Sequence, residues 1–204
     1  MITIVDYGVG NVQAIANIYK RLDIPVTMAG QAAALRGATH VVLPGVGAFD
    51  WALSRLSASG MREPLDALVQ GGQCAVLGIC VGMQMLADRS DEGQLAGLGW
   101  IPGEVKLFDE ARFKVRTHLP HMGWNDVQPH AGDPLFRGLE ASARFYFLHS
   151  YYFAAEQELD VLALTDYCGS FACGVRRNRV YGVQFHPEKS HQWGIQLLKN
   201  FAEI

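Results

Sequence analysis

One cysteine stands where a reactive thiol is expected. Cys80 lies in the segment Gly78-Ile79-Cys80-Val81-Gly82, with a glycine two residues before it and another two residues after it. A G-x-C-x-G pattern between a buried strand and a helix has the form of a nucleophile elbow, a sharp turn whose flanking residues must be small. The first amides of a helix beginning near Gly82 would favour the thiolate, which is the nucleophilic form. The alternative is a buried, inert cysteine at the end of a core strand.

A second segment offers a base and its orienting partner. His186 and Glu188 flank Pro187 after the strand-like run VYGVQF, and alternate residues of an extended chain share one face, roughly 6.6 Å apart. Because proline cannot continue a ladder of hydrogen bonds, we expect the strand to end here with both side chains exposed. Glu188 would accept from one ring nitrogen of His186 and leave the other to exchange a proton with Cys80. A surface ion pair or a helix-capping glutamate is the alternative.

A third segment, Leu43-Pro44-Gly45-Val46-Gly47-Ala48, closes another strand with two glycines around a valine. Such a loop can turn a backbone amide inward with no side chain in the way. An oxyanion hole needs amides of this kind, aimed at the charge that grows on a tetrahedral intermediate. We expect the amides of Val46 and Val81 to be the donors. The alternative is a glycine turn without a catalytic role.

The elements that must position these segments indicate an α/β fold in the first half of the chain. Short, continuous, β-branched runs are typical of parallel strands buried on both faces, and they occur at 3–6, 40–44 and 74–80. Helix-like segments alternate with them at 11–21, 51–56 and 64–69. Ligands bind at the carboxyl ends of such strands, which would gather around one crevice the loops at 8–11, 45–47, 80–82 and 186–188.

The second half has a different pattern from about residue 103 onward. Strand-like segments follow one another without long helices, at 112–116, 144–153, 160–167 and 179–185. A final helix over 191–204 has on one face Ile195, Leu198 and Phe201 or Ala202. The predicted fold is an open mixed, mainly parallel sheet flanked by helices with an antiparallel extension. With no repeat and no linker, we expect a single domain over 1–204.

The composition excludes several classes of function. The 204 residues are 50% hydrophobic and 18% charged, with a net charge of -3, so we expect neither disorder nor binding to nucleic acid. The basic group Arg176, Arg177 and Arg179 is expected to be a solvated hairpin turn. The uncharged run between Asp66 and Asp88 has roughly the length of a membrane span, but its glycines and glutamines argue against one. The start of the chain has no basic region of a secretory signal.

The cysteines and glycines suggest neither a metal nor a cofactor. We expect a cytoplasmic protein whose four cysteines, at 74, 80, 168 and 173, are reduced thiols. The spacing of Cys168 and Cys173 is one that zinc allows, but no second pair completes four ligands. Gly8-x-Gly10 lacks the third glycine of a dinucleotide fingerprint. We therefore predict no metal site and no cofactor.

The motifs together resemble class I glutamine amidotransferases. The elbow GICVGMQ, the loop LPGVGAF and the segment QFHPEKS match that family, with its Cys-His-Glu order. The finer pattern of PGVGAF, PHMGWN (120–125) and YFLHSYY (146–152) is similar to the glutaminase subunits of imidazole glycerol phosphate synthases, in histidine biosynthesis. The likeness runs from IVDYGVGN near the start to HPEKS near the end.

The resemblance implies a role for each matching residue. Cys80 would be the nucleophile, His186 the base and acid, and Glu188 its orienting partner. Gln84 would help to hold the substrate glutamine, and Glu92 would bind its α-amino group, since an ammonium needs a carboxylate. Backbone groups would complete the oxyanion hole and the substrate pocket at Gly45, Val46, Gly47, Val81, Ser150 and Tyr151.

The resemblance also implies a reaction and a partner. Glutamine would be hydrolysed through a glutamyl thioester, and the ammonia would pass to a separate (βα)8-barrel cyclase subunit, in a heterodimer that makes imidazole glycerol phosphate and AICAR. Candidate contact residues are Asn11, Trp124, Tyr146 and Lys189, although Trp124 and Tyr146 could be core and Lys189 a solvated charge. In the family the glutaminase is nearly silent until the cyclase binds its ligand. Our hypothesis is that the Val46 amide turns inward only in the active complex.

Other functions share parts of this pattern. A glutaminase serving a synthase of anthranilate, GMP or pyridoxal phosphate would have the same triad, but PHMGWN and PGVGAF argue against it. A γ-glutamyl hydrolase or another cysteine hydrolase acting alone would need no partner surface. A non-catalytic binding module would not need an intact set of Cys80, His186 and Glu188.

Overall fold

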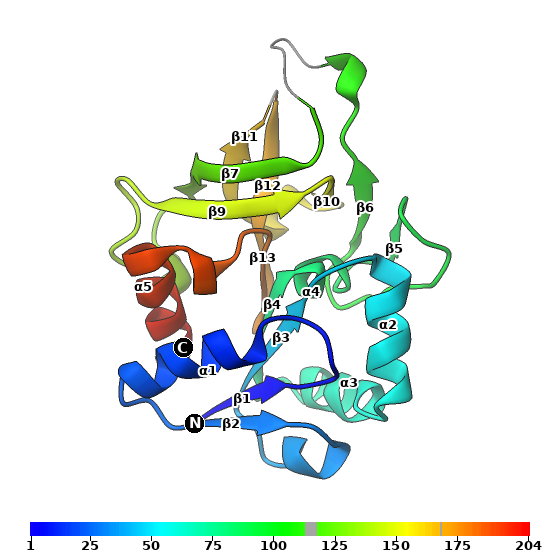
Figure 1. The fold of residues 1–204 in the computed structure, drawn as a ribbon, viewed down its shortest axis with the longest axis vertical. Helices are drawn as coiled ribbons and strands as arrows, with labels where there is room; N and C mark the ends of the chain where they lie inside the picture. Colours follow the sequence, from blue (N-terminus) through cyan, green and yellow to red (C-terminus); the bar gives the residue numbers. More distant parts are fainter. Residues whose placement is uncertain (113–117, 168) are drawn as a thin grey trace.

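The computed structural model describes residues 1–112, 118–167 and 169–204. Figure 1 shows a lower part built of parallel strands between helices and an upper part built of antiparallel strands. Arg112 ends a short 3-10 turn, and the remainder of the strand predicted over 112–116 lies outside the described residues, as does Cys168.

The parallel half of the larger sheet includes the strands whose carboxyl ends position the predicted site residues. Its strands, in spatial order, are β2 (Val26–Ala29), β1 (Ile2–Val5), β3 (His40–Gly45), β4 (Ala75–Cys80) and β13 (Val180–Val183). Every neighbouring pair in this order is parallel. All residues of β1, β4 and β13 are buried, as expected for β-branched runs covered on both faces.

The antiparallel half continues from β13. The sheet extends through β12 (Ser170–Arg177), β10 (Tyr151–Ala155), β6 (Gly103–Leu107) and the short edge strand β5 (Arg89–Ser90). Strand β11 (Val161–Asp166) also pairs with β12, and the short strand β8 (Gln128–Pro129) pairs with β11. A separate two-stranded sheet consists of β7 (His121–Asp126) and β9 (Arg144–His149). The predicted mixed, mainly parallel sheet with an antiparallel extension is confirmed.

Helices cover both sides of the parallel strands (Figure 1). The α-helices are α1 (Val12–Arg21), α2 (Phe49–Ala58), α3 (Arg62–Gln70), α4 (Val81–Gln84) and α5 (His191–Ala202). Short 3-10 turns are η1 (Ala32–Leu35), η2 (Glu110–Arg112), η3 (Pro134–Phe136), η4 (Glu158–Asp160) and η5 (Pro187–Lys189). Helix α1 packs against α5 and η5. No helix within the described ranges is long and apolar enough to cross a membrane.

Several boundaries differ from the sequence prediction. The strand-like run 144–153 is two strands in different sheets, because the chain changes direction at Ser150. The run 179–185 joins β12 antiparallel but β4 parallel, since it returns from the extension to the centre of the sheet. Strand β2 was not predicted. In α5 the apolar face is centred on Leu197, Leu198 and Phe201, and Ile195 is only partly buried.

The helix expected after the elbow is a single turn. Helix α4 ends at Gln84, and the chain continues in turns through Ala87. A β-carbon added at Gly82 would lie 2.0 Å from the carbonyl oxygen of Leu43, at the end of the neighbouring strand β3. The elbow and the end of β3 are therefore packed backbone against backbone, and only glycine fits at position 82.

Replacing Gly82 by alanine should destabilise the fold. We expect Gly82→Ala to lower the free energy of unfolding by about 1–3 kcal/mol through overpacking, measured by urea denaturation. Gly30→Ala is the matched control, because a β-carbon there meets nothing within 4 Å. The control should stay within about 0.5 kcal/mol of the original protein. Equal effects of the two substitutions would contradict the close contact at Gly82.

Candidate active site

Cys80 occupies a strained position between β4 and α4. It is the last residue of β4 and precedes the first residue of α4, with φ 55° and ψ -114°. A non-glycine residue in such a region costs of order 1–3 kcal/mol and persists only where the surroundings fix it. Here β4 is paired on both sides, with β3 and β13. The sharp strand-to-helix turn predicted for the elbow is confirmed.

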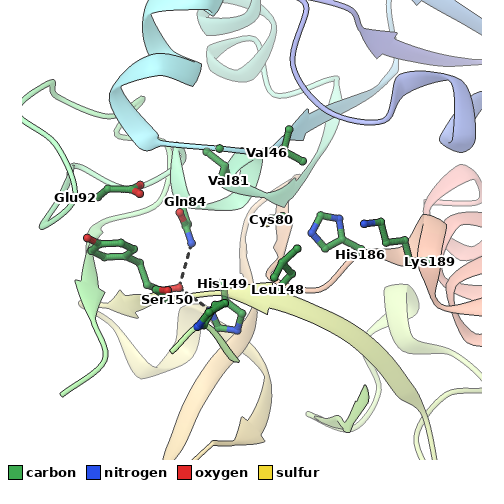
Figure 2. A pocket seen from close by; sticks show the side chains of 13 residues that line it. Val46, Cys80, Val81, Gln84, Glu92, Leu148, His149, Ser150, His186 and Lys189 are labelled. Atoms are coloured by element: carbon green, nitrogen blue, oxygen red, sulfur yellow. Dashed lines mark hydrogen bonds between the residues drawn. The ribbon is translucent and has the colours of Figure 1, made fainter. Parts of the chain in front are cut away.

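Cys80 lines a pocket of about 300 Å³ (Figure 2). Most of the predicted site residues line it: Val46, Gly47, Cys80, Val81, Gln84, Glu92, Ser150, Tyr151, His186 and Lys189. Gly45 is buried and does not line the pocket; it pairs with Cys80 at the end of the β3–β4 ladder. Pocket residues that were not predicted are Pro120, Leu148 and His149.

His186 and Glu188 are in contact, but not in the way the sequence predicted. The Nδ1 atom of His186 lies 2.8 Å from Oε1 of Glu188, and the two side chains are only 4% and 3% exposed. The prediction of exposed side chains on an extended strand is wrong. Pro187 starts the η5 turn, and this tight turn brings the Glu188 carboxylate to the Nδ1 atom of His186.

Backbone hydrogen bonds hold the base in place. The amide of His186 donates to the carbonyl of Tyr146 at 2.9 Å, and the hydroxyl of Ser190 donates to the carbonyl of His186 at 2.6 Å. The same hydroxyl accepts from the amide of Tyr146 at 3.0 Å. Strand β9 and the η5 turn therefore form one rigid unit behind the imidazole.

The surroundings of His186 favour its protonated form. Burial alone would lower the pKa of this ring, but hydrogen bonds to the Cys80 sulfur and the Glu188 carboxylate, together with the charges of both, outweigh it and raise the pKa from 6.5 to about 10. An imidazole in contact with a cysteine sulfur on one side and a carboxylate on the other is the arrangement of a nucleophile, its base and the group that orients the base.

Two glutamines connect the elbow to strand β10. The Nε2 group of Gln84 donates to the carbonyl of Tyr151 and to Oε1 of Gln184, both at 3.1 Å. The side-chain nitrogen Nε2 of Gln184 in turn lies 3.8 Å from the Cys80 sulfur. Gln184 was not among the predicted site residues. Its position two residues before His186, on the same face of an extended chain, was the signal that could have identified it.

Glu92 is fixed by α2, the helix that follows the loop at 45–47. Its Oε2 atom accepts from the amide of Phe49 at 2.9 Å, at the start of α2. A second contact joins the same two segments, because the carboxylate of Asp50 in α2 accepts from the amides of Gln94 and Leu95, at 2.8 and 3.1 Å. One carboxylate oxygen of Glu92 is thus occupied, and the other is available at the rim of the pocket.

The loop at 45–47 is held at its other end by Tyr7. The buried hydroxyl of Tyr7 donates to the carbonyl of Pro44 at 2.6 Å. Burial and the charge of Cys80 both raise the pKa of this phenol, so it remains a donor. Val46, in the middle of the loop, is 40% exposed. The loop is therefore anchored at Pro44 and at Phe49 and open to solvent between them.

The carbonyl oxygens of Ser150 and Tyr151 already have partners within the chain. Ser150 accepts from the amide of Phe108 at 3.2 Å, and Tyr151 accepts from Gln84 and from Nδ1 of His149, the latter at 2.7 Å (Figure 2). This segment lines the pocket as predicted, with its carbonyls committed to holding the pocket together.

The other described cysteines are poor candidates for a nucleophile. Cys74 and Cys173 are buried; burial raises the pKa of the Cys74 thiol to about 11 and raises that of Cys173 as well. No group of three potential metal ligands occurs among the residues the structure describes. Of the basic residues predicted as a solvated hairpin turn, Arg176 and Arg177 end strand β12, are partly buried and pair with Asp133 and Asp160 at 2.6 and 3.2 Å.

Three of the four candidate contact residues form one cluster beside the pocket. The ring of Trp124 stacks on His191 at 5.2 Å and meets Tyr146 edge-on at 6.2 Å, and the ammonium of Lys189 lies 5.6 Å from the centre of the Tyr146 ring. Trp124 remains 38% exposed. The fourth candidate, Asn11, is exposed and caps α1 by accepting from the amide of Ala14 at 3.2 Å.

Comparison with known proteins decides the family. Residues 3–204 match the model of the family described as glutamine amidotransferase class-I. The chain belongs to the class I glutamine amidotransferases. It is 59% identical to imidazole glycerol phosphate synthase subunit HisH of Bdellovibrio bacteriovorus and 47% identical to the subunit HisH of Leptospira interrogans, in each case over the full length of both chains.

Solved structures share the fold of this amidotransferase at lower identity. A glutamine amidotransferase crystal structure superposes with a TM-score of 0.76 at 19% identity, covering 100% of this chain and 99% of the other. The PurLQS structure from Thermotoga maritima gives 0.72 at 17% identity, covering 99% of this chain and 97% of the other. The elbow between β4 and α4 therefore lies in an established amidotransferase fold.

The raised pKa of His186 gives a testable titration. Because it lies above the ordinary value of 6.5, protonation stabilises the folded state fully below about pH 6.5, and this contribution is lost as the pH rises toward 10. We expect Cys80→Ser to lower the pKa of His186, since a neutral hydroxyl replaces the charged sulfur. The measurement is a pH titration of the His186 ring nitrogens by NMR.

The matched control for this titration is Cys74→Ser, which changes a buried cysteine away from the pocket. The control should leave the His186 midpoint where it is in the unmodified protein. A midpoint that Cys80→Ser leaves unchanged would show that the sulfur does not stabilise the imidazolium.

Proposed function

We propose that this amidotransferase is the glutaminase subunit of an imidazole glycerol phosphate synthase, which hydrolyses glutamine and delivers the ammonia to a partner cyclase. The observation that carries the proposal is the convergence of Cys80, His186 and the Gly45–Gly47 loop on one pocket. Support for the particular synthase comes from full-length relatives whose name is imidazole glycerol phosphate synthase subunit HisH, at up to 59% identity.

The first half of the reaction forms a thioester. The Cys80 thiolate attacks the carboxamide carbon of glutamine, and the amides of Val46 and Val81 stabilise the negative charge on its oxygen. When the tetrahedral intermediate collapses, the carbon–nitrogen bond breaks and His186 gives its proton to the leaving nitrogen. Ammonia departs, and the γ-glutamyl group remains on the sulfur.

The second half restores the enzyme. His186, now neutral, removes a proton from water, and the resulting hydroxide adds to the thioester carbon. The carbon–sulfur bond then breaks, which releases glutamate and regenerates the thiolate beside a protonated imidazole. Glu188 holds the ring in the same orientation through both halves, since its contact is to Nδ1 and leaves Nε2 for proton transfer.

The pocket has groups that suit the other end of glutamine. The free carboxylate oxygen of Glu92 would bind the α-ammonium, while its second oxygen stays on the amide of Phe49. Gln84 donates both amide protons to the protein, so its oxygen would accept from the substrate. A carboxylate would thus face the positive charge of the substrate, and an amide oxygen would face a hydrogen-bond donor of the substrate.

A partner cyclase would cover the side of the pocket that carries the aromatic cluster. Trp124, Tyr146 and Lys189 would contact the cyclase, and the anchored His186–Tyr146 backbone would connect that contact to the base. The exposed Val46 loop would reach its active orientation in the complex. Asn11, which caps α1, is the remaining candidate on the partner side.

The proposed function is tested by release of ammonia from glutamine, with and without the cyclase and its nucleotide ligand. Cys80→Ala should lower glutamine-dependent turnover at least about a thousandfold, while the complex still uses free ammonia. Cys74→Ala, at a buried site outside the pocket, should retain turnover within a few-fold. Full glutaminase activity of Cys80→Ala would exclude Cys80 as nucleophile, and high activity without any cyclase would point to a hydrolase acting alone.

The anchor on the oxyanion loop gives a second prediction. Tyr7→Phe removes only the hydroxyl that holds the Pro44 carbonyl, so kcat should fall about three- to tenfold, the worth of one uncharged hydrogen bond, with KM nearly unchanged. Steady-state kinetics of the complex measure both constants.

Tyr19→Phe is the matched control, because the Tyr19 hydroxyl is buried without a partner among the described residues. It should leave kcat within about twofold of the unmodified enzyme. If the two substitutions lower kcat equally, the Tyr7 hydroxyl has no specific effect on the loop.

A further inference from the structure

Two buried histidines adjoin the pocket without belonging to the triad. His121 on β7 and His149 at the end of β9 are both buried, and Nδ1 of His121 lies 3.0 Å from Nε2 of His149. His149 also lines the pocket. Buried polar groups are kept only where they are hydrogen-bonded, so the bonds of this pair define what it does.

The hydrogen bonds assign every ring proton. Nδ1 of His149 lies 2.7 Å from the carbonyl oxygen of Tyr151, which can only accept, so Nδ1 carries the proton. The unprotonated Nε2 of His149 then accepts from Nδ1 of His121. Nε2 of His121 accepts in turn from the side-chain amide of Asn125 at 3.3 Å. Donation therefore runs one way, from Asn125 through both rings to Tyr151.

Both rings are neutral under ordinary conditions. Burial lowers the pKa of His149 to about 3, against a smaller opposing effect of its bond to Tyr151, and burial lowers the pKa of His121 to about 4. A protonated His149 would have no acceptor for the bond from His121. The neutral state keeps the one-way chain intact.

This series of hydrogen bonds ends on the carbonyl of Tyr151, which helps to orient a residue of the pocket. The oxygen of Tyr151 accepts from His149 and also from Nε2 of Gln84, at 3.1 Å (Figure 2). Gln84 uses its other amide proton on Gln184, beside the Cys80 sulfur. A rotation of the Tyr151 carbonyl would remove one of the two bonds that orient Gln84.

The series of hydrogen bonds begins on strand β7, whose two faces differ in burial. Residues His121 and Asn125 face inward on β7, whereas Met122 and Trp124 alternate with them and are 60% and 38% exposed. Asn125 is held by a second bond, from its amide to the carbonyl of Asp166 at 2.7 Å. The strand that would meet the partner on one face thus supports the substrate pocket with the other.

We propose that His121 and His149 are positioning residues for glutamine binding: they hold the Tyr151 carbonyl and, through it, the side chain of Gln84. This inference rests on the proposed glutaminase function. It requires a donor at the Nδ1 position of residue 149, and the bond from His121 to Nε2 orients the ring that carries this donor.

Substitutions at position 149 separate the two ring nitrogens. In His149→Asn the side-chain amide takes the place of Nδ1 and still donates to Tyr151, so KM for glutamine should stay within about threefold. In His149→Gln the amide takes the place of Nε2 and the bond to Tyr151 is lost, so KM should rise at least about tenfold with a smaller change in kcat. Both are measured by ammonia release in the complex with the cyclase.

Substitutions at position 121 give an independent second measurement. His121→Asn retains a donor in the place of Nδ1, whereas His121→Leu removes it, so the leucine variant should show the larger rise in KM. His130→Gln, at an exposed position whose side chain has no partner among the described residues, should change neither constant. Each variant is checked for folding by its thermal unfolding midpoint.

The outcomes distinguish this inference from the proposed function. Equal KM values for the asparagine and glutamine variants at position 149, or for the asparagine and leucine variants at position 121, would overturn the positioning role. If the glutamine variant does not fold, the position 121 pair decides alone. Failure of the unmodified complex to release ammonia from glutamine would instead overturn the function itself.

Discussion

The backbone of Cys80 is the constraint on which the site depends. A cysteine with φ 55° is strained. It is held because β4 pairs with β13 as far as Ile79 and with β3 as far as Cys80 itself, where Gly45 lies opposite. The contact of Gly82 with the Leu43 carbonyl closes the turn from the other side. Any side chain at position 82 would separate the two strand ends. The same packing that strains Cys80 thus brings it to the pocket that Val46 and Gly47 also line.

Polar groups around the sulfur are buried, and most of them are paired. Gln84, Gln184 and the carbonyl of Tyr151 form a connected set behind the elbow, so the substrate meets groups whose orientation is already fixed. Glu188 is the exception, since its Oε2 atom is buried without a partner among the described residues. A carboxylate with one unsatisfied oxygen interacts strongly with the imidazolium of His186 in a low dielectric, which accords with the raised pKa of that ring.

The sequence predicted the chemistry more completely than the geometry. Cys80 and its glycines indicated the elbow because small flanking residues are a local requirement of a sharp turn. The burial of His186 and Glu188 was not predictable, because it depends on β9 and α5 packing around the η5 turn, far away in the sequence. For the same reason the role of Tyr7 was missed: its partner, the carbonyl of Pro44, is a backbone group that carries no side-chain signal.

The central claim is that the sulfur of Cys80, and no other group, carries the glutamyl intermediate. Its most direct test is mass spectrometry of the protein quenched in acid during turnover with glutamine, followed by digestion. The account predicts a γ-glutamyl thioester that fragmentation of the peptides assigns to Cys80, and none on Cys74, which lies on the same tryptic peptide, or on Cys173. An adduct on a different residue, or release of glutamate with no thioester even when turnover is slowed at low temperature, would contradict it.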